Sequence, residues 1–503
     1  MLPSSRRVVT VLALATLLGP PAAGALDWPM FGRDLKHSFT NAGSLINTSN
    51  VAFLQTAWDF PTSDAVSASP TVVDGRVYVG AWDGFFYALD STSGALIWSF
   101  QVDCDSNITP IPPQCPGGPT PPQDRVQTDG GLITSSATVD KGKVYFGAGK
   151  TVYCLNAADG SLVWKKVICG NPEAPSCEND PNDPNQIFSS PAVFKHRVFV
   201  GASTDGRATG YRGGIVALDT RTGKQRWRFE VDPVLDPNGK PVRVRGKVVG
   251  QNRGCGNVWG SGAIDEKKRL VFFGTADCGA DAPPPYHEAI LALRTGSGRA
   301  RWAYRPRQGD VCDFDFGASP NVIDLGGHQW VGVGGKDGTY YVLERLTRNS
   351  GGQLVWRSNV VFGGSAGGFI GSTAFDGQRA YGGTALGDFG GQPCDPNDPR
   401  DTPTQQPTMH AFDPTARTVA WEQNGPPAFG ATSVANGVVL VGALFPPSLR
   451  AFDAGSGTLL AQITMPGSVN SAPALIGGTA FVTSGNSFNG AGGGVHALRL
   501  LLP

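Results

Sequence analysis

The chain has no excess charge of either sign, few histidines and no long apolar run after its first 25 residues. Lys plus Arg and Asp plus Glu each number 41 among 503 residues, so neither a basic surface for nucleic acid nor an acidic tail is expected. The six histidines are scattered, and no HExxH, P-loop or Rossmann pattern stands in a suitable context. No CxxCH occurs, so the chain attaches no c-type haem itself. These absences exclude several large classes of metal, nucleotide and nucleic-acid binding proteins.

The N-terminus carries the pattern of a secretory signal. MLPSSRRVVTVLALATLLGPPAAGALDW contains a basic pair, an apolar stretch and the small residues Ala23-Gly24-Ala25. The pattern predicts a signal peptide over residues 1–25, removed after Ala25, and export to the periplasm or the cell exterior. The apolar stretch is short for a membrane span and no later segment qualifies, so no span is expected after signal removal. A short N-terminal anchor is the alternative.

Nine cysteines in an exported chain predict disulfides. Two pairs bracket short loops, Cys104 with Cys115 and Cys169 with Cys177. Two further bridges are expected among Cys255, Cys278, Cys312 and Cys394, whose partners the sequence leaves open. Cys154, within the apolar strand pattern TVYCLN, is expected to be a buried free thiol.

Glycine (69) and proline (39) are abundant, and an internal repeat dominates the chain. Units such as VYVGAWDGFFYALDSTSGALIW contain alternating apolar residues joined by DG and TSG turns, which is typical of short half-buried strands. Their tryptophans are Trp98, Trp164, Trp227, Trp302, Trp356 and Trp421. A four-stranded unit repeated around an axis is a β-propeller. The prediction is therefore an all-β fold, with a single eight-bladed propeller domain over residues 26–503.

The eighth unit lacks its outer strand, and FLQTAWDF near the N-terminus, with Trp58, is expected to supply it and close the ring. With strands a to d in each blade, the d–a and b–c links emerge on one face and the a–b and c–d links on the other. The long inserts are all d–a or b–c links, and the eight cysteines assigned to disulfides lie in them. We therefore expect function on that face.

The repeat AxDxxTGxxxW, seen as ALDSTSGALIW and ALDTRTGKQRW, resembles the blade signature of the pyrroloquinoline-quinone (PQQ) dependent alcohol dehydrogenases. DFDFGASP, GGKDGTYYVLE and GGQLVWRSNVVFGGSAGG are similar to segments of the polyvinyl-alcohol dehydrogenases within that family. The resemblance implies an eight-bladed propeller that binds PQQ and Ca²⁺ on its axis and oxidises an alcohol.

Several site residues follow from the resemblance. Trp259 matches the tryptophan that forms a floor under the quinone, and its wide aromatic surface suits a flat ring. Asp277 stands where the family has a calcium-binding Asn, and Asp is also a hard oxygen ligand. The family's ligand Glu is missing from the loop GASTDGRATGYRGG, in which Asp205 is the available carboxylate. Each of these residues could instead be a core tryptophan or a solvated loop acid.

Asp310 in GDVCDFDF matches the family's catalytic base, with Asp313 as the alternate because an insert found in the polyvinyl-alcohol enzymes is missing here. Asp315 is assigned mainly to support the entry of the next strand. Lys336 occupies the place of a basic residue near the quinone oxygens, where a cation would stabilise the reduced cofactor. A lysine in a turn is otherwise more often a solvated charge.

Two functions therefore remain open. One is an exported quinoprotein dehydrogenase that oxidises a small or polymeric alcohol and passes electrons to a separate acceptor such as a cytochrome. The other is a non-catalytic propeller that binds a ligand or a protein partner through the same face. Against the enzyme stand the missing Glu, the missing vicinal Cys-Cys pair, a replaced Arg in GGLITSSATVD and Gly371 in place of a family Trp.

Overall fold

The computed structural model describes residues 27–102, 133–175, 177–180, 183–204, 209–278, 286–307, 312–346, 351–385, 387, 394–395, 397–400, 405–485 and 493–500. Within these ranges the regular structure is almost entirely β-strand, with short 3-10 helices η2 (Val51–Phe53) and η3 (Cys177–Asn179). None of the helices among them is long and apolar enough to cross a membrane. The signal peptide predicted over residues 1–25 lies outside the described residues.

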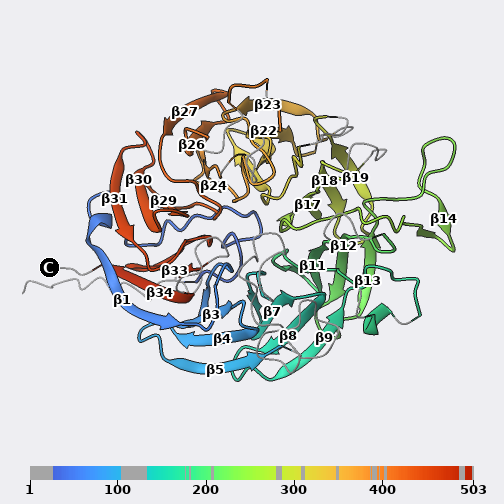
Figure 1. Cartoon of the computed structure of the whole chain (residues 1–503), viewed down its shortest axis with the longest axis horizontal. Coiled ribbons are helices and arrows are strands. Elements are labelled where there is room, and N and C mark those ends of the chain that lie inside the picture. The colour runs from blue at the N-terminus through green and yellow to red at the C-terminus, as the bar shows by residue number, and fades with distance from the viewer. Residues whose placement is uncertain are drawn as a thin grey trace, which may run out of the picture.

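Eight antiparallel sheets of four strands form a ring in the described part of the chain (Figure 1), as the repeat predicts. Blades 1 to 4 contain β2 (Thr71–Val73), β3 (Arg76–Gly80), β4 (Phe85–Asp90), β5 (Leu96–Gln101); β6 (Thr138–Asp140), β7 (Lys143–Ala148), β8 (Thr151–Asn156), β9 (Leu162–Val167); β10 (Ala192–Phe194), β11 (Arg197–Ala202), β12 (Gly214–Asp219), β13 (Gln225–Phe229); and β16 (Ala263–Asp265), β17 (Leu270–Gly274), β18 (Ile290–Arg294), β19 (Ala300–Tyr304). Blades 5 to 7 contain β20 (Asn321–Leu325), β21 (His328–Gly334), β22 (Thr339–Glu344), β23 (Leu354–Asn359); β24 (Ala374–Phe375), β25 (Ala380–Gly383), β26 (Met409–Asp413), β27 (Thr418–Gln423); and β28 (Ser433–Ala435), β29 (Val438–Ala443), β30 (Ser448–Asp453), β31 (Leu459–Thr464).

The last sheet combines strands from both ends of the chain. Its order is β1 (Leu54–Pro61), β34 (Gly494–Leu500), β33 (Thr479–Ser484) and β32 (Ala474–Ile476). β1 runs antiparallel to β34, from Leu54 opposite Leu500 to Pro61 opposite Gly494. Outside the blades, the insert after blade 3 forms a small hairpin of β14 (Arg243–Val244) and β15 (Lys247–Val248), which protrudes from the ring in Figure 1.

The TG-to-Trp part of the repeat joins one blade to the next. Trp98, on the outer strand of blade 1, lies across Gly160 of blade 2 and donates its indole N–H to the Ala157 carbonyl at 3.1 Å. The same pair of contacts is made by Trp58, Trp164, Trp227, Trp302 and Trp421 on Gly94, Gly223, Gly298, Gly352 and Gly457. Because these glycines have positive φ and support an indole, no other residue fits without strain.

An N-terminal segment, residues 27–45, lies against the inner strands and crosses from blade to blade. Trp28 pairs with Val72 of blade 1, and the Leu35 and Lys36 carbonyls accept from the inner strands of blades 4 and 5. Further backbone bonds join Pro29 to Val139, Ser38 to Phe375, Phe39 and Asn41 to Val434, and Leu45 to Gly477. The segment therefore contacts the inner strands or their turns in seven blades.

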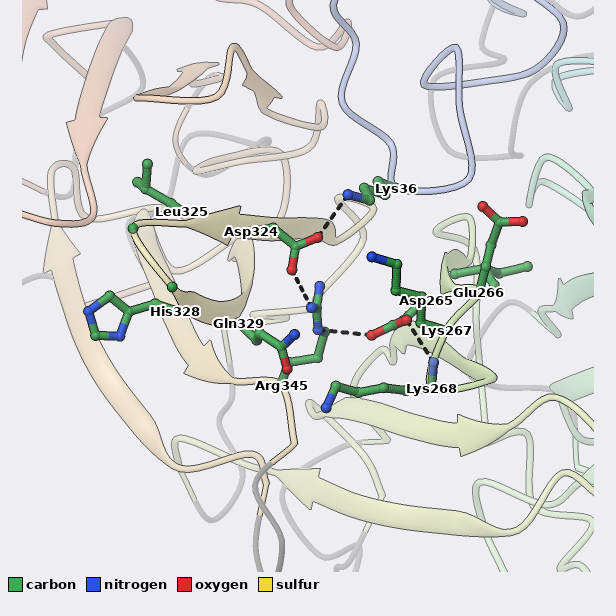
Figure 2. A pocket seen from close by; sticks show the side chains of 13 residues that line it. Lys36, Asp265, Glu266, Lys267, Lys268, Asp324, Leu325, His328, Gln329 and Arg345 are labelled. Carbon is green, nitrogen blue, oxygen red and sulfur yellow. Dashed lines mark hydrogen bonds and ion pairs between the residues drawn. The ribbon is translucent and has the colours of Figure 1, made fainter.

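A chain of ions fastens this segment to blades 4 and 5 (Figure 2). Lys36 Nζ lies 2.8 Å from Asp324 Oδ2, Asp324 also binds the Arg345 guanidinium, and Arg345 Nε lies 3.0 Å from Asp265 Oδ2. Arg345 and Asp265 are buried, and they line a cavity of about 430 Å³ on the a–b side. The ion pairs among Lys36, Asp324, Arg345 and Asp265 join two blades and the N-terminal segment.

The Trp–Gly contact can be tested at Gly160, where φ is +73° and a Cβ would lie 2.6 Å from Trp98 Cε3. Gly160→Ala is expected to lower the free energy of unfolding by about 3 kcal/mol through backbone strain and overpacking. The control is Gly142→Ala, with φ +71° and open space around the position, which should cost only about 1 kcal/mol. Denaturant unfolding measures both, and equal losses would contradict the docking role.

The N-terminal segment should make stability depend on pH through His37, which is 1% exposed. Burial lowers the pKa of His37 to about 3. The unfolded imidazole takes a proton below about pH 6.5 while the folded one cannot, so stability should fall as pH drops from 6.5 toward 3, by at most about 1.4 kcal/mol per pH unit. His37→Gln should reduce this slope in denaturant unfolding measured from pH 7 to 4. An unchanged slope would contradict the assignment.

Candidate active site

Four links on one face of the ring bring the predicted site residues together between blades 4 and 5. Trp259 precedes β16, Asp277 follows β17, Asp313 and Asp315 lie between β19 and β20, and Lys336 follows β21. These are d–a and b–c links, which strand alternation places on the insert-bearing face. Link topology thus explains how residues up to 77 positions apart in sequence, Trp259 and Lys336, meet at one site.

Asp315 stands at the centre of the cluster. Its Oδ1 accepts the backbone N–H of Asp277 at 2.8 Å, and its Oδ2 accepts the indole N–H of Trp259 at 2.9 Å. Carboxylate oxygens of Asp277, Asp313 and Asp315 all lie within 4.8 Å of one another. Such a group of hard oxygen ligands suits a cation with two or more positive charges.

Lys336 is buried among these acids and is not the solvated lysine typical of a turn. Its side chain is 5% exposed, and Nζ lies 2.7 Å from Asp313 Oδ2 and 3.5 Å from Asp315 Oδ2. Burial alone would lower the pKa of Lys336, but the carboxylates of Asp315 and Asp313 outweigh it and raise that pKa. Lys336 is therefore a fixed positive charge.

Asp313 is more accessible than Asp315, the other acid in contact with Lys336. Its side chain is 44% exposed, although desolvation and the neighbouring charge of Asp315 raise the pKa of Asp313 to about 8. Its φ of +58° is a left-handed conformation that Asp tolerates better than most residues. An accessible carboxyl with such a pKa can hold or release a proton near neutral pH.

Trp259 forms one wall of the site. A Cβ on Gly317 would fall inside the Trp259 ring, so the glycine allows the indole to pack directly on the backbone after Asp315. The indole N–H bond to Asp315 fixes the rotation of the ring, and the residue remains partly exposed. A half-exposed aromatic face beside a group of acids can stack a flat ligand that also binds a cation.

Two predicted residues cannot be placed. Asp310 and Asp205 both lie outside the described residues, so their roles as base and metal ligand stay predictions.

Asp315 has more contacts within the site than its predicted role at the strand entry implies. The signal in the sequence was the DFDF motif, which places Asp313 and Asp315 two residues apart in one link.

The described disulfides all lie in links on the insert-bearing face. Cys169 pairs with Cys177 as predicted, and the pairs left open by the sequence are Cys255–Cys278 and Cys312–Cys394. Cys154 is a buried free cysteine, as expected. The predicted pair of Cys104 and Cys115 lies outside the described residues.

A second polar group, near the first, does not offer a metal site. His287 Nε2 lies 3.4 Å from Asp232 Oδ1, and Cys278 is the third member of the group. Asp232 also pairs with Arg253 at 2.7 Å, and the Cys278 sulfur is used in its disulfide. Because the sulfur of Cys278 is in a disulfide and is not a thiolate, the group keeps only two of its three ligands.

Two Ser/Thr–His–acid triads also occur, but they are structural. His496 connects Ser484 at 2.7 Å with Asp59 at 2.6 Å in the last blade. In blade 6, His410 bonds Thr384 and Glu422 in the same way. Ser484 and Thr384 are both fully buried, so no substrate reaches their hydroxyls. The same triad occurs across strands b, c and d of two blades, which indicates that its hydrogen bonds stabilise the pairing of these strands.

Comparison with known proteins shows the family to which the chain belongs. Residues 28–357 match the PQQ family described as "Glucose/ethanol/alcohol dehydrogenase, beta-propeller domain". The chain belongs to this family. The matched residues include Trp259, Asp277, Asp313, Asp315 and Lys336.

Three relatives illustrate the range of the family. The polyvinylalcohol dehydrogenase of Sphingopyxis sp. (strain 113P3) is 23% identical over 90% of this chain and 72% of its own length. The quinohemoprotein alcohol dehydrogenase of Comamonas testosteroni is 28% identical over 58% of this chain and 40% of its own length, and its crystal structure superposes with a TM-score of 0.71 over 94% of this chain and 80% of that one. A europium-containing methanol dehydrogenase also gives a TM-score of 0.71, at 19% identity over 95% of this chain and 98% of that chain. The chain thus spans less than half the length of some curated relatives that it matches.

The charge of Lys336 should hold the acids together in the absence of a cation. Lys336→Met removes the positive charge between Asp313 and Asp315. It is expected to lower the free energy of unfolding by about 3 kcal/mol. Lys336→Arg should cost less, because the charge is kept. Added Ca²⁺ should restore part of the Met variant's stability in thermal unfolding. A Met variant as stable as the wild type would show that the acids are not ionised together.

Proposed function

We propose that the protein is an exported quinoprotein dehydrogenase that oxidises an alcohol with PQQ and a bound cation. The observation that carries this proposal is the cluster of Trp259, Asp277, Asp313, Asp315 and Lys336 between blades 4 and 5. Membership of the family supports a dehydrogenase of the quinoprotein type. The substrate class and the cation are the parts that the reconstitution below addresses.

The residues present fit a planar cofactor with a cation beside it. Trp259 offers a partly exposed aromatic surface whose rotation is fixed by Asp315. Asp277 and Asp315 would hold the cation together with one oxygen of Asp313, and Lys336 would hold an anionic group of the cofactor through charge. Bound PQQ would supply the acceptor for a hydride from the alcohol carbon.

Asp313 is the residue best placed to take the alcohol proton. One of its oxygens is held by Lys336 at 2.7 Å, while the side chain as a whole is 44% exposed and open to a small molecule. Asp315 is poorly suited, because both its oxygens accept hydrogen bonds and it is buried. Asp310, three residues before Asp313, is tested alongside it.

The cation is proposed as Ca²⁺ or a trivalent lanthanide. Three carboxylates close together favour an ion of higher charge, and one structural relative is named for its europium. The family's Glu has no described counterpart in the residues flanking positions 205–208, and Asp205 would have to serve there. Gly371 packs against the backbone of Gly430, which leaves no room for the family Trp at that point.

Export and a separate acceptor complete the proposal. The predicted signal over residues 1–25 and the disulfides are consistent with an oxidising compartment. Electrons would leave to a separate acceptor such as a cytochrome, because these 503 residues contain no CxxCH. A primary, secondary or polymeric alcohol is the expected substrate class, and the relatives include polyvinylalcohol dehydrogenases.

The test is reconstitution of the purified protein with PQQ and either Ca²⁺ or La³⁺, followed by alcohol-dependent dye reduction. Asp313→Asn should lower kcat by roughly 10²-fold or more, because a positioned base is lost, while PQQ binding measured by absorbance is retained. Asp324→Asn, on the opposite face, is the control and should keep full activity.

The outcomes separate the alternatives. If Asp310→Asn abolishes turnover and Asp313→Asn does not, the base is Asp310. If neither cation supports uptake of PQQ, the dehydrogenase proposal is wrong and the chain is a non-catalytic propeller.

A further inference from the structure

We propose that the disulfides Cys255–Cys278 and Cys312–Cys394 position the cation ligands of this site, so that cation affinity depends on their being oxidised. This inference rests on the proposed cation site. The carboxylate-bearing residues Asp277 and Asp313 are each the direct chain neighbour of a half-cystine, Cys278 and Cys312.

The first bridge closes a small ring around Asp315. From Cys255 the chain runs four residues to Trp259, whose indole N–H binds Asp315 Oδ2 at 2.9 Å. The other oxygen of Asp315 accepts the N–H of Asp277 at 2.8 Å, and Asp277 leads directly to Cys278. The disulfide joins the two ends, with Cα atoms 5.1 Å apart. Trp259, Asp277 and Asp315 therefore belong to one closed loop of covalent and hydrogen bonds.

The bridge anchors the link that carries Asp277 immediately after this residue. β17 ends at Gly274, three residues earlier, and the link to β18 extends to residue 289. On the near side of Asp277, backbone bonds join Ala276 N–H to the Asn257 carbonyl at 3.0 Å and Glu288 N–H to the Ala276 carbonyl at 3.1 Å, and the disulfide follows directly on its other side. A ligand on a long link loses orientation when its anchor is removed, which weakens metal binding.

The second bridge anchors Asp313 across a greater distance in sequence. Cys312 joins Cys394, 82 residues away in the long b–c link of blade 6. Asp313 itself adopts φ +58° and is held by Lys336, and the next residue, Phe314, has its carbonyl bound by Arg307 at 2.6 Å. The disulfide adds a covalent anchor on the other side of Asp313.

The third described disulfide provides a matched control. Cys169–Cys177 also lies in a link on the insert-bearing face, but neither half-cystine adjoins an acid of the cluster. Its loss should reduce thermal stability without changing the site.

The experiment measures Tb³⁺ binding by luminescence excited through tryptophan, because Trp259 touches Asp315 and can transfer energy to a bound ion. The variants are Cys255→Ser with Cys278→Ser, Cys312→Ser with Cys394→Ser, and the control Cys169→Ser with Cys177→Ser. We expect the Kd for Tb³⁺ to rise roughly 10-fold or more in the first two and by less than about 2-fold in the control. Asp315→Asn assigns the luminescence to this site by removing it.

Circular dichroism and thermal unfolding report whether each variant is folded at the temperature of the titration. If a Ser pair fails to fold, the wild type is titrated before and after reduction by dithiothreitol under conditions that preserve its circular dichroism. An unchanged Kd in folded variants, or after reduction confirmed by thiol counting, overturns the inference while leaving the cation site intact. If the wild type binds neither Tb³⁺ nor Ca²⁺, the cation site and this inference both fail.

Discussion

The structure depends on one repeated contact, an indole of one blade laid flat on a glycine of the next. The contact fixes the distance between neighbouring sheets, and the indole N–H bond to a carbonyl fixes their register. Blades 4 and 5, which flank the site, are joined in this way by Trp302 on Gly352, with a bond of 2.7 Å to the Arg345 carbonyl. Where the TG turn is missing, as between blades 5 and 6, Trp356 instead packs edge-on against Tyr340 and Phe412. The Trp–Gly contacts at the outer strands thus fix the positions of the blades, and with them the links that carry the site residues.

A rigid ring makes it possible to hold like charges close together. Asp277, Asp313 and Asp315 repel one another, and Lys336 offsets only part of that repulsion. Their separations are set by links anchored on two docked blades, so the acids cannot simply move apart. This repulsion raises the pKa of Asp313. The rigid blades also keep the carboxylate oxygens close together as preformed ligands, which a single loop would not maintain.

The fold could be predicted from the sequence because its signals are local: alternating strands, TG turns and a tryptophan at fixed spacing. That Trp259, Asp277 and Lys336 lie on one face of the propeller could be predicted, because the alternating direction of the strands alone decides on which face each link lies. The burial of Lys336 could not be read from GGKDG, since a lysine in a turn is ordinarily solvated, and its burial arises from links of another blade. The disulfide partners were undecidable for the same reason. The path of residues 27–45 was missed because that segment has no periodicity and its partners lie as far as 434 residues away.

That segment has a consequence for the order in which the molecule is made. Asn41 bonds the Leu475 carbonyl, and β1 pairs with β34 at the other end of the chain. The stretch synthesised early therefore waits for its partners until the last blade has emerged, and the ring has no complete intermediate to which it could dock. Blades can form their hairpins one by one, but Asn41 and β1 meet their partners only after the last blade has been made. Under the export proposed above, such late completion would postpone the compact state until the chain has crossed the membrane.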